Sequence, residues 1–332
     1  MIIVRAPFRL PLGGGGSDLP SYYKNHEGFL LTAAINKYMY ININEPAIIN
    51  KIKINYSNVE IVDILDVEKI KHDIVRESLK YLKISRPLEI SSMADLSAGT
   101  GMGSSSSYTV ALLKGLNTMT RRHITTYELA EEACKIEIDQ ISKPIGKQDQ
   151  YASAYGGIIQ LEIDKQGNVK VTPLEIEEEV IYELENRLLM FYTNIERDAN
   201  IILSEQSTKA RNNEEEALQS MHNIKKIGHK IKESLLQGDI DRLGILFNEH
   251  WLEKKHISNK MSNPEIDFWY DHALKNGALG GKIMGAGGGG FLIFCCKEGQ
   301  RKNLRIAMES IGLSYMDFNF DFEGAKVLAN IK

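Results

Sequence analysis

The chain has 332 residues, 43% hydrophobic and 25% charged, which is typical of soluble proteins, and its length predicts about two domains. A formal net charge of −4 argues against nucleic acid or an anionic membrane as a partner, because both attract a strong positive field. The apolar runs fall short of the roughly 20 residues that span a bilayer, and the N-terminus is too interrupted by charge and proline for a signal peptide, so we expect a cytoplasmic protein.

The three cysteines, Cys134, Cys295 and Cys296, do not follow the spacing of a zinc site or of a disulfide framework. The last two are adjacent in a β-like run, which would point their side chains to opposite faces. We expect reduced cysteines buried in a core.

The N-terminal part alternates strand patterns with a glycine-rich loop. Strands are expected at residues 2–4, 29–34, 38–44 and 51–56. Residues 5–7 are expected to interrupt the first strand, and the regular Lys/Ile alternation of the last predicts a half-buried antiparallel strand. The run Gly13-Gly14-Gly15-Gly16-Ser17-Asp18 predicts a tight, exposed loop whose backbone approaches another group closely.

The most informative stretch follows a helix expected at residues 67–82 and a strand at 88–92. In Gly99-Thr100-Gly101-Met102-Gly103 the alternating glycines permit φ > 0 and the close approach of a bulky group. Four serines then open an apolar helix, whose free N–H groups and dipole favour an anion. The pattern predicts a polyanion site, although a flexible turn entering an ordinary helix would look the same in isolation.

A helix expected at residues 126–141 places one carboxylate on an apolar face. Glu137 shares that face with Ala130, Cys134 and Ile141, because the spacings are 4, 3 and 4. A carboxylate there is costly unless it is paired or binds a metal. Glu137 is therefore either a metal ligand or a boundary residue bonded to neighbouring backbone.

The next stretch, Lys143-Pro144-Ile145-Gly146-Lys147-Gln148-Asp149, is expected to be a turn, followed by a strand at 158–163. Its two lysines create a positive setting around the aspartate. Asp149 is therefore a candidate catalytic group or, alternatively, a solvated turn residue.

The C-terminal half begins with a buried strand expected at residues 187–193. Helical patterns follow at residues 200–218 and on to 236, 239–254 and 263–276. A third glycine-rich run, residues 280–290, precedes an apolar strand. It contains G-x-G-x-x-G but opens a strand rather than a helix, which excludes a Rossmann dinucleotide site.

Glycine-rich loops with carboxylates downstream suit phosphoryl transfer, which needs amides around phosphates, a hard cation on oxygen ligands and a group that positions the nucleophile. Here the chain resembles the GHMP small-molecule kinases, which include galactokinase and mevalonate kinase. Three motifs in family order carry the resemblance over the whole length. They are residues 6–18, Gly99-Thr100-Gly101-Met102-Gly103-Ser104-Ser105 and residues 282–290 with the strand that follows.

The resemblance implies an α+β fold of two lobes with the active site between them. Residues 1–175 would form the N-terminal ATP-binding lobe, and residues 176–332 a ferredoxin-like lobe enlarged by helices. Mg²⁺ would be held by Ser105 and Glu137. The residues implied to bind ATP are Gly99, Thr100, Gly101, Met102, Gly103, Ser104, Ser105 and Ser106.

The resemblance also assigns the catalytic pair. Asp149 would accept or orient the proton of the acceptor hydroxyl, with Arg9 beside it. Two positions depart from the family pattern: Ala98 stands where proline is usual, and Arg9 where many members have lysine. Arginine does not deprotonate, so Arg9 would act as a fixed cation and not as a proton shuttle.

Within the family, the run Gly14-Gly15-Gly16-Ser17-Asp18-Leu19-Pro20 is similar to the heptose 7-phosphate kinases of GDP-heptose synthesis and to the kinase part of fucokinases. The compact length favours the former, which implies that ATP phosphorylates the anomeric hydroxyl of a sugar phosphate. Arg197 is the preferred ligand of the substrate phosphate, with Lys143 and Lys147 as further candidates. The residues implied to bind the substrate are Gly15, Gly16, Ser17, Asp18, Arg197, Gly287 and Gly288.

Two other functions stay open at this point. One is a kinase for a free sugar such as fucose, and the other is a non-catalytic sensor of sugar and nucleotide on the same fold. The expected partners are a small-molecule sugar phosphate and, as an option, a second copy of the chain in a homodimer.

Overall fold

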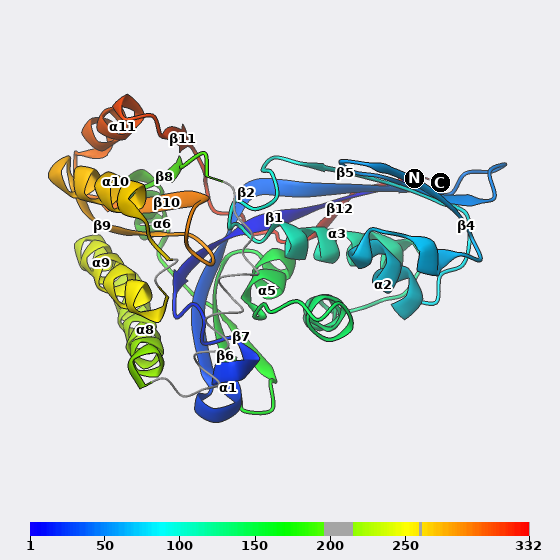
Figure 1. The fold of residues 1–332 in the computed structure, drawn as a ribbon, viewed down its shortest axis with the longest axis horizontal. Helices are drawn as coiled ribbons and strands as arrows, with labels where there is room; N and C mark the ends of the chain where they lie inside the picture. Colours follow the sequence, from blue (N-terminus) through cyan, green and yellow to red (C-terminus); the bar gives the residue numbers. More distant parts are fainter. Residues whose placement is uncertain (196–214, 259–260, 332) are drawn as a thin grey trace.

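Two β-sheets form the frame of the chain in this computed structural model, which describes residues 1–195, 215–258 and 261–331 (Figure 1). The strands of the first sheet are β1 (Ile2–Gly13), β2 (Gly28–Asn44), β3 (Lys51–Asn55), β4 (Val59–Asp63), β5 (Leu88–Ala94), β6 (Ile158–Ile163), β7 (Val169–Pro173) and β12 (Lys326–Asn330). They run in the order β12-β1-β2-β5-β3-β4, and β6 and β7 continue the sheet beside the first half of β2.

Strand β1 is longer than the sequence pattern suggests. The interruption expected at residues 5–7 is confined to a shift of the register with β2 between Pro7 and Phe8, after which pairing continues. A proline lacks the N–H that a regular ladder needs, and an irregularity at the strand accommodates it. As a result β1 reaches from the end of the first sheet to the glycine loop at residues 13–18.

Helices cover one side of the first sheet (Figure 1). They are α2 (Asp73–Tyr81), α3 (Ser104–Met119), α4 (Thr126–Cys134), the π-helix η2 (Lys135–Gln140) and α5 (Gln148–Tyr155). The helix expected at 67–82 is interrupted, since a 3₁₀ turn, η1 (Val67–Lys69), precedes α2. The strand expected at 51–56 pairs antiparallel with β4, as predicted, but parallel with β5.

The second sheet has the order β11-β8-β10-β9 and antiparallel pairs. Its strands are β8 (Leu188–Tyr192), β9 (Ala278–Ile283), β10 (Phe291–Cys296) and β11 (Ser314–Met316), and the helices of this lobe are α6 (Glu178–Arg187), α8 (Glu215–Leu236), α9 (Ile240–Ile257), α10 (Pro264–Lys275) and α11 (Arg301–Ser310). From β8 to β11 the chain runs strand, helices, strand, strand, helix, strand, with the first strand between the last and the third. This βαββαβ pattern confirms the ferredoxin-like lobe with extra helices.

The two lobes share one apolar core. Phe8 and Leu10 of β1 and Phe29 of β2 belong to the same buried cluster as Met190 of β8 and Phe247 of α9. The glycine loop at the end of β1 is therefore held against the second lobe.

The end of the chain returns to the first lobe. Strand β12 pairs antiparallel with β1, and the amino group of Met1 donates to the carbonyl oxygen of Ile331. The two termini consequently lie together at the far end of the first sheet (Figure 1). The domain boundary at residue 175 stays a prediction. Strand β12, which lies beyond that boundary, is part of the first sheet.

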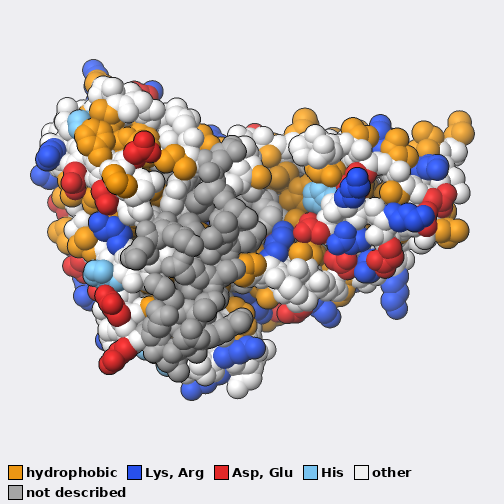
Figure 2. Space-filling model, viewed as in Figure 1, with side chains coloured by type: hydrophobic (Ala, Val, Ile, Leu, Met, Phe, Trp, Pro, Cys, Tyr) orange, Lys and Arg blue, Asp and Glu red, His pale blue; other side chains and the backbone are white. Residues whose placement is uncertain are grey.

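Charges of both signs are interspersed over the arm made by the first sheet and its helices (Figure 2). Apolar side chains gather at the tip of that arm in this view (Figure 2). The exposed large apolar residues include Ile48, before β3, and Val59, Ile61 and Leu65, in and just after β4. Within the described residues, every helix is too short or too polar to cross a bilayer. The three cysteines are unpaired and buried, as expected.

Candidate active site

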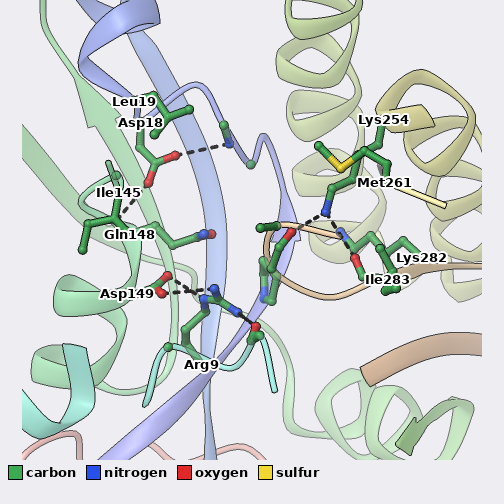
Figure 3. Close-up of a pocket in the computed structure, with 18 of the residues that line it drawn as sticks. Arg9, Asp18, Leu19, Ile145, Gln148, Asp149, Lys254, Met261, Lys282 and Ile283 are labelled. Atoms are coloured by element: carbon green, nitrogen blue, oxygen red, sulfur yellow. Dashed lines mark hydrogen bonds and ion pairs between the residues drawn. The ribbon is translucent and has the colours of Figure 1, made fainter. Parts of the chain in front are cut away.

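A cavity of about 370 Å³ lies where the glycine-rich loops of the two lobes meet (Figure 3). The first lobe lines it with the end of β1, the glycine loop after β1, the start of α3 and the start of α5. The second lobe lines it with α9, the end of β9 and the loop that follows β9. The three sequence motifs are thus brought to one place.

The glycine-rich loop at residues 99–103, here termed the phosphate loop, has the backbone conformation that its glycines predict. Gly99, Gly101 and Gly103 have φ values of 80°, 80° and 79°, and Gly103 directly precedes α3. The first N–H groups of α3 have no partner within the helix, and the helix dipole favours negative charge there. Loop and helix together are thus suited to bind an anion at the cavity wall.

The residues expected to bind ATP divide into two groups. Gly99, Gly101, Gly103, Ser104 and Ser105 line the cavity. The side chains of Thr100, Met102 and Ser106 are buried instead and do not line the cavity.

The third glycine loop supports the phosphate loop from the second lobe. A Cβ atom at Gly290 would lie 2.3 Å from the carbonyl oxygen of Thr100, and one at Gly285 would lie 2.7 Å from that of Gly101. Such distances are too short for any side chain, so glycine is required at both positions. Residues 280–283 of this run belong to β9, so the loop is shorter than the sequence pattern indicates.

Gly287 and Gly288 do not reach the substrate cavity. A Cβ atom on Gly287 would meet the sulfur of Met261 at 2.6 Å, and the Gly288 N–H donates to the carbonyl of Met261. The cavity is lined by Gly285 and Ala286 of the same loop. The expectation that Gly287 and Gly288 contact substrate therefore finds no support in their position.

Arg9 and Asp149 form a bidentate ion pair at the cavity (Figure 3). The Arg9 Nε lies 2.6 Å from Asp149 Oδ1, and Nη2 lies 3.1 Å from Oδ2. The remaining Arg9 nitrogen, Nη1, donates to the Gly101 carbonyl at 2.6 Å. One buried guanidinium therefore fixes the carboxylate and the phosphate loop relative to each other.

Asp149 lies in the first turn of α5 and not in a turn between elements, so this part of the sequence prediction is wrong. Pro144 and Gly146, which indicate a turn, precede the helix, and the helix begins at Gln148. A helix N-terminus is a favourable place for a carboxylate because the dipole is positive there.

Glu137 is fully buried and faces Ser105. The Ser105 hydroxyl donates to Glu137 Oε1 at 2.7 Å, Gln150 Nε2 donates to Oε2 at 2.8 Å, and Lys143 Nζ lies 3.3 Å from Oε1. Glu137 is presented by the π-helix η2, a feature that often marks functional positions in helices. Its partners are side chains, rather than the backbone groups of the alternative reading.

Ser105 and Glu137 offer two adjacent oxygen donors of the kind that Mg²⁺ prefers. Within the described residues, His, Cys, Asp and Glu side chains do not form a cluster of three or more suited to a metal. Mg²⁺ in nucleotide sites commonly takes one or two protein ligands and completes its shell with phosphates and water. The donor set therefore fits Mg²⁺ in company with a nucleotide.

The loop after β1 has one residue aimed at the cavity and one that holds the loop. Ser17 is buried, its hydroxyl lies 2.8 Å from the carbonyl oxygens of Gly14 and Phe29, and it does not line the cavity. Asp18 lines the cavity with Gly15 and Gly16, and its carboxylate accepts from the Gly16 and Gln148 N–H groups. Burial raises the pKa of the Asp18 carboxyl, and the nearby Asp149 charge adds to the rise.

Of the three candidate cations for a substrate phosphate, the structure places Lys143 at the cavity. Arg197 lies outside the described residues. Lys147 is paired with Glu131 at 2.9 Å and donates to the Gly167 carbonyl, so it does not line the cavity. Lys143 lines it beside Glu137.

Sequence reasoning did not single out three basic cavity residues. His250 and Lys254 come from α9 and Lys282 from β9. His250 and Lys254 are four residues apart and so share a helix face, which was the only available local signal. Their approach to the first lobe depends on the fold.

Two protein-family models match the chain. GHMP kinases N terminal domain matches residues 69–157, and GHMP kinases C terminal matches residues 231–311. The chain is also 33% identical to D-glycero-alpha-D-manno-heptose 7-phosphate kinase from Campylobacter jejuni over 339 aligned residues, which cover 98% of each protein. The chain belongs to the GHMP kinase family. The family resemblance and the fold expected from the sequence are thereby confirmed.

Other relatives of this GHMP kinase include sugar kinases. The crystal structure of a D-glycero-D-manno-heptose 1-phosphate kinase from Bacteroides thetaiotaomicron has a TM-score of 0.82 and 26% identity over 100% of both chains. A bifunctional fucokinase/GDP-fucose pyrophosphorylase from Arabidopsis thaliana is 26% identical over 332 residues, 92% of this chain and 31% of that protein. As a member of the family, the chain is a phosphotransferase of the kinase class.

Proposed function

We propose that this kinase transfers the γ-phosphoryl group of ATP to the anomeric hydroxyl of D-glycero-D-manno-heptose 7-phosphate, giving the 1,7-bisphosphate in the cytoplasmic synthesis of GDP-heptose. The observation that carries the reaction type is the bidentate Arg9–Asp149 pair, set between the phosphate loop and the Asp18 loop. The choice of sugar is supported by the heptose kinase among the relatives and by the several basic side chains in the cavity.

In this proposal Asp149 acts on the nucleophile. Its carboxylate accepts the proton of the anomeric hydroxyl as that oxygen bonds to the γ-phosphorus and the bond from phosphorus to the β–γ bridging oxygen breaks. ADP then leaves. Arg9 holds the carboxylate in place and presents a fixed positive charge to the transferring group.

The other residues bind and orient. The phosphate loop and the first amides of α3 hold the β- and γ-phosphates. Ser105 and Glu137 would hold Mg²⁺, which supplies positive charge against the phosphates when bound. Asp18 accepts hydrogen bonds from sugar hydroxyls through lone pairs that its two backbone donors leave available.

The test is ADP release with Mg-ATP against heptose 7-phosphate, mannose 6-phosphate, fucose, galactose and mevalonate. We expect turnover with the heptose phosphate and little with the unphosphorylated acceptors. Turnover confined to fucose or galactose would instead indicate a free-sugar kinase. Binding of sugar and nucleotide without turnover on any acceptor would favour the sensor.

A further inference from the structure

The cavity wall contributed by the second lobe carries basic side chains that the mechanism above does not use. His250 and Lys254 come from α9, and Lys282 comes from β9. Figure 3 shows Lys254 and Lys282 across the cavity from Asp18 and Asp149. Of the described residues that line the cavity, the acidic ones belong to the first lobe, so this wall has charge of one sign only.

His250 is buried in that wall without a hydrogen-bond partner. Its side chain is 3% exposed, and neither ring nitrogen is bonded to another group among the described residues. Burying an imidazole in this way is costly unless a partner is supplied. Because the residue borders the cavity, a bound ligand is in a position to supply it.

Lys282 is a buried ammonium group without a carboxylate partner among the described residues. It is 2% exposed, its ammonium donates to the Leu12 carbonyl and lies 4.5 Å from the centre of the Phe247 ring. The described residues include no carboxylate in an ion pair with it. Burial, followed by the charges of Lys254 and Arg9, holds the pKa of Lys282 well below its usual range. An anion in the cavity would relieve that cost.

We infer that His250, Lys254 and Lys282 form an anion subsite for the phosphate ester that the acceptor sugar carries. The inference rests on the proposed function and names the residues that recognise the acceptor's own phosphate. The phosphates of ATP have a separate site, at the phosphate loop and the N-terminus of α3 on the first lobe. A phosphate held by the second lobe would therefore place the sugar between the two walls.

The first test replaces His250 with phenylalanine, which has a similar shape but no donor. We expect His250→Phe to raise the KM for heptose 7-phosphate by about 10- to 100-fold, the range expected for a lost hydrogen bond to a charged group, and to leave the KM for ATP unchanged. Lys282→Met should act in the same direction. His250→Asn, which retains an N–H donor, should recover part of the loss.

His272→Phe is the matched control. His272 lies on α10, also has a buried ring nitrogen without a described partner, and does not line the cavity. Its KM values should equal those of the wild type. If His250 only fills space, His250→Phe should also match the wild type, which would overturn the inference.

The second test measures binding without ATP, by calorimetric titration of heptose 7-phosphate in the presence and absence of inorganic phosphate. Wild type should bind the sugar phosphate in competition with phosphate, and both substitutions should weaken it at least tenfold. Wild-type binding without turnover would refute the proposed function and leave the subsite standing. Normal binding and turnover in His250→Phe and Lys282→Met would refute the subsite alone. Failure of the wild type to bind either anion would refute both the subsite and the proposed function.

Discussion

At the scale of single residues, the site depends on one arginine that does two tasks. Arg9 holds Asp149 through two nitrogens and the Gly101 carbonyl through the third, while being 5% exposed. A lysine could not make these contacts together, because it offers a point charge rather than a planar fork. The departure from the lysine of many family members is thus structurally meaningful.

Asp149→Asn should lower kcat by about 10²- to 10⁴-fold, because the amide keeps the size of the side chain and cannot accept the proton. ATP affinity should change little, since Arg9 keeps its own hydrogen bond to the Gly101 carbonyl of the phosphate loop. Steady-state ADP release and nucleotide titration measure the two quantities. Asp271→Asn, at an exposed position on α10, is the control and should behave as wild type. Near-normal kcat in Asp149→Asn would show that this carboxylate is not the base.

At the scale of elements, the two glycine loops work as one unit, since Gly290 permits the third loop to lie against Thr100 of the phosphate loop. Gly290→Ala should displace the phosphate loop and lower kcat/KM for ATP by about 10²-fold, the usual cost of a shift near 1 Å. Gly312→Ala is the matched control, because Gly312 also has a positive φ of 91° but open space around its Cβ position. Both substitutions place a side chain at a positive φ, so the backbone strain is common to the two variants and only the loop contact differs. Equal activity in the two would show that the loop contact is unimportant.

The elements also show what a sequence can and cannot predict. The phosphate loop and the serine-rich first turn of α3 depend on neighbouring residues, so their pattern is interpretable from the sequence. Strand β12 was missed because it pairs with β1 from the other end of the chain. His250 was missed for a similar reason, since a lone histidine in a helix acquires meaning only when the fold sets it at a cavity. Ser17, predicted to bind substrate, does not line the cavity, and the sequence does not distinguish a buried hydroxyl from an exposed one.

At the scale of the whole molecule, stability is expected to depend on pH through His250. Burial, followed by the charges of Lys282 and Lys254 that face it, holds the pKa of His250 well below the usual 6.5. The folded chain therefore keeps this ring neutral while the unfolded chain takes up a proton below about pH 6.5. Since the unfolded state binds more protons there, the contribution to stability is complete above that pH and is lost as pH falls.

Urea unfolding between about pH 7.5 and 5 measures this dependence. In His250→Phe the decline of the unfolding free energy should be shallower by up to about 1.4 kcal/mol per pH unit, the value of one proton. Other histidines with lowered pKa, such as His72 and His229, remain in both proteins and cancel in the difference. Parallel curves for the two proteins would contradict the expectation.

The whole molecule brings a glycine-rich loop, the Arg9–Asp149 pair and a basic wall around one cavity, and the central claim is that they phosphorylate the anomeric position of a sugar phosphate. The most direct measurement is phosphorus NMR of the product formed from heptose 7-phosphate and Mg-ATP. We predict one new phosphomonoester, coupled to the anomeric proton and formed in equal amount with ADP, while the original ester persists. Formation of free phosphate alone, or of an ester at another carbon, would contradict the account.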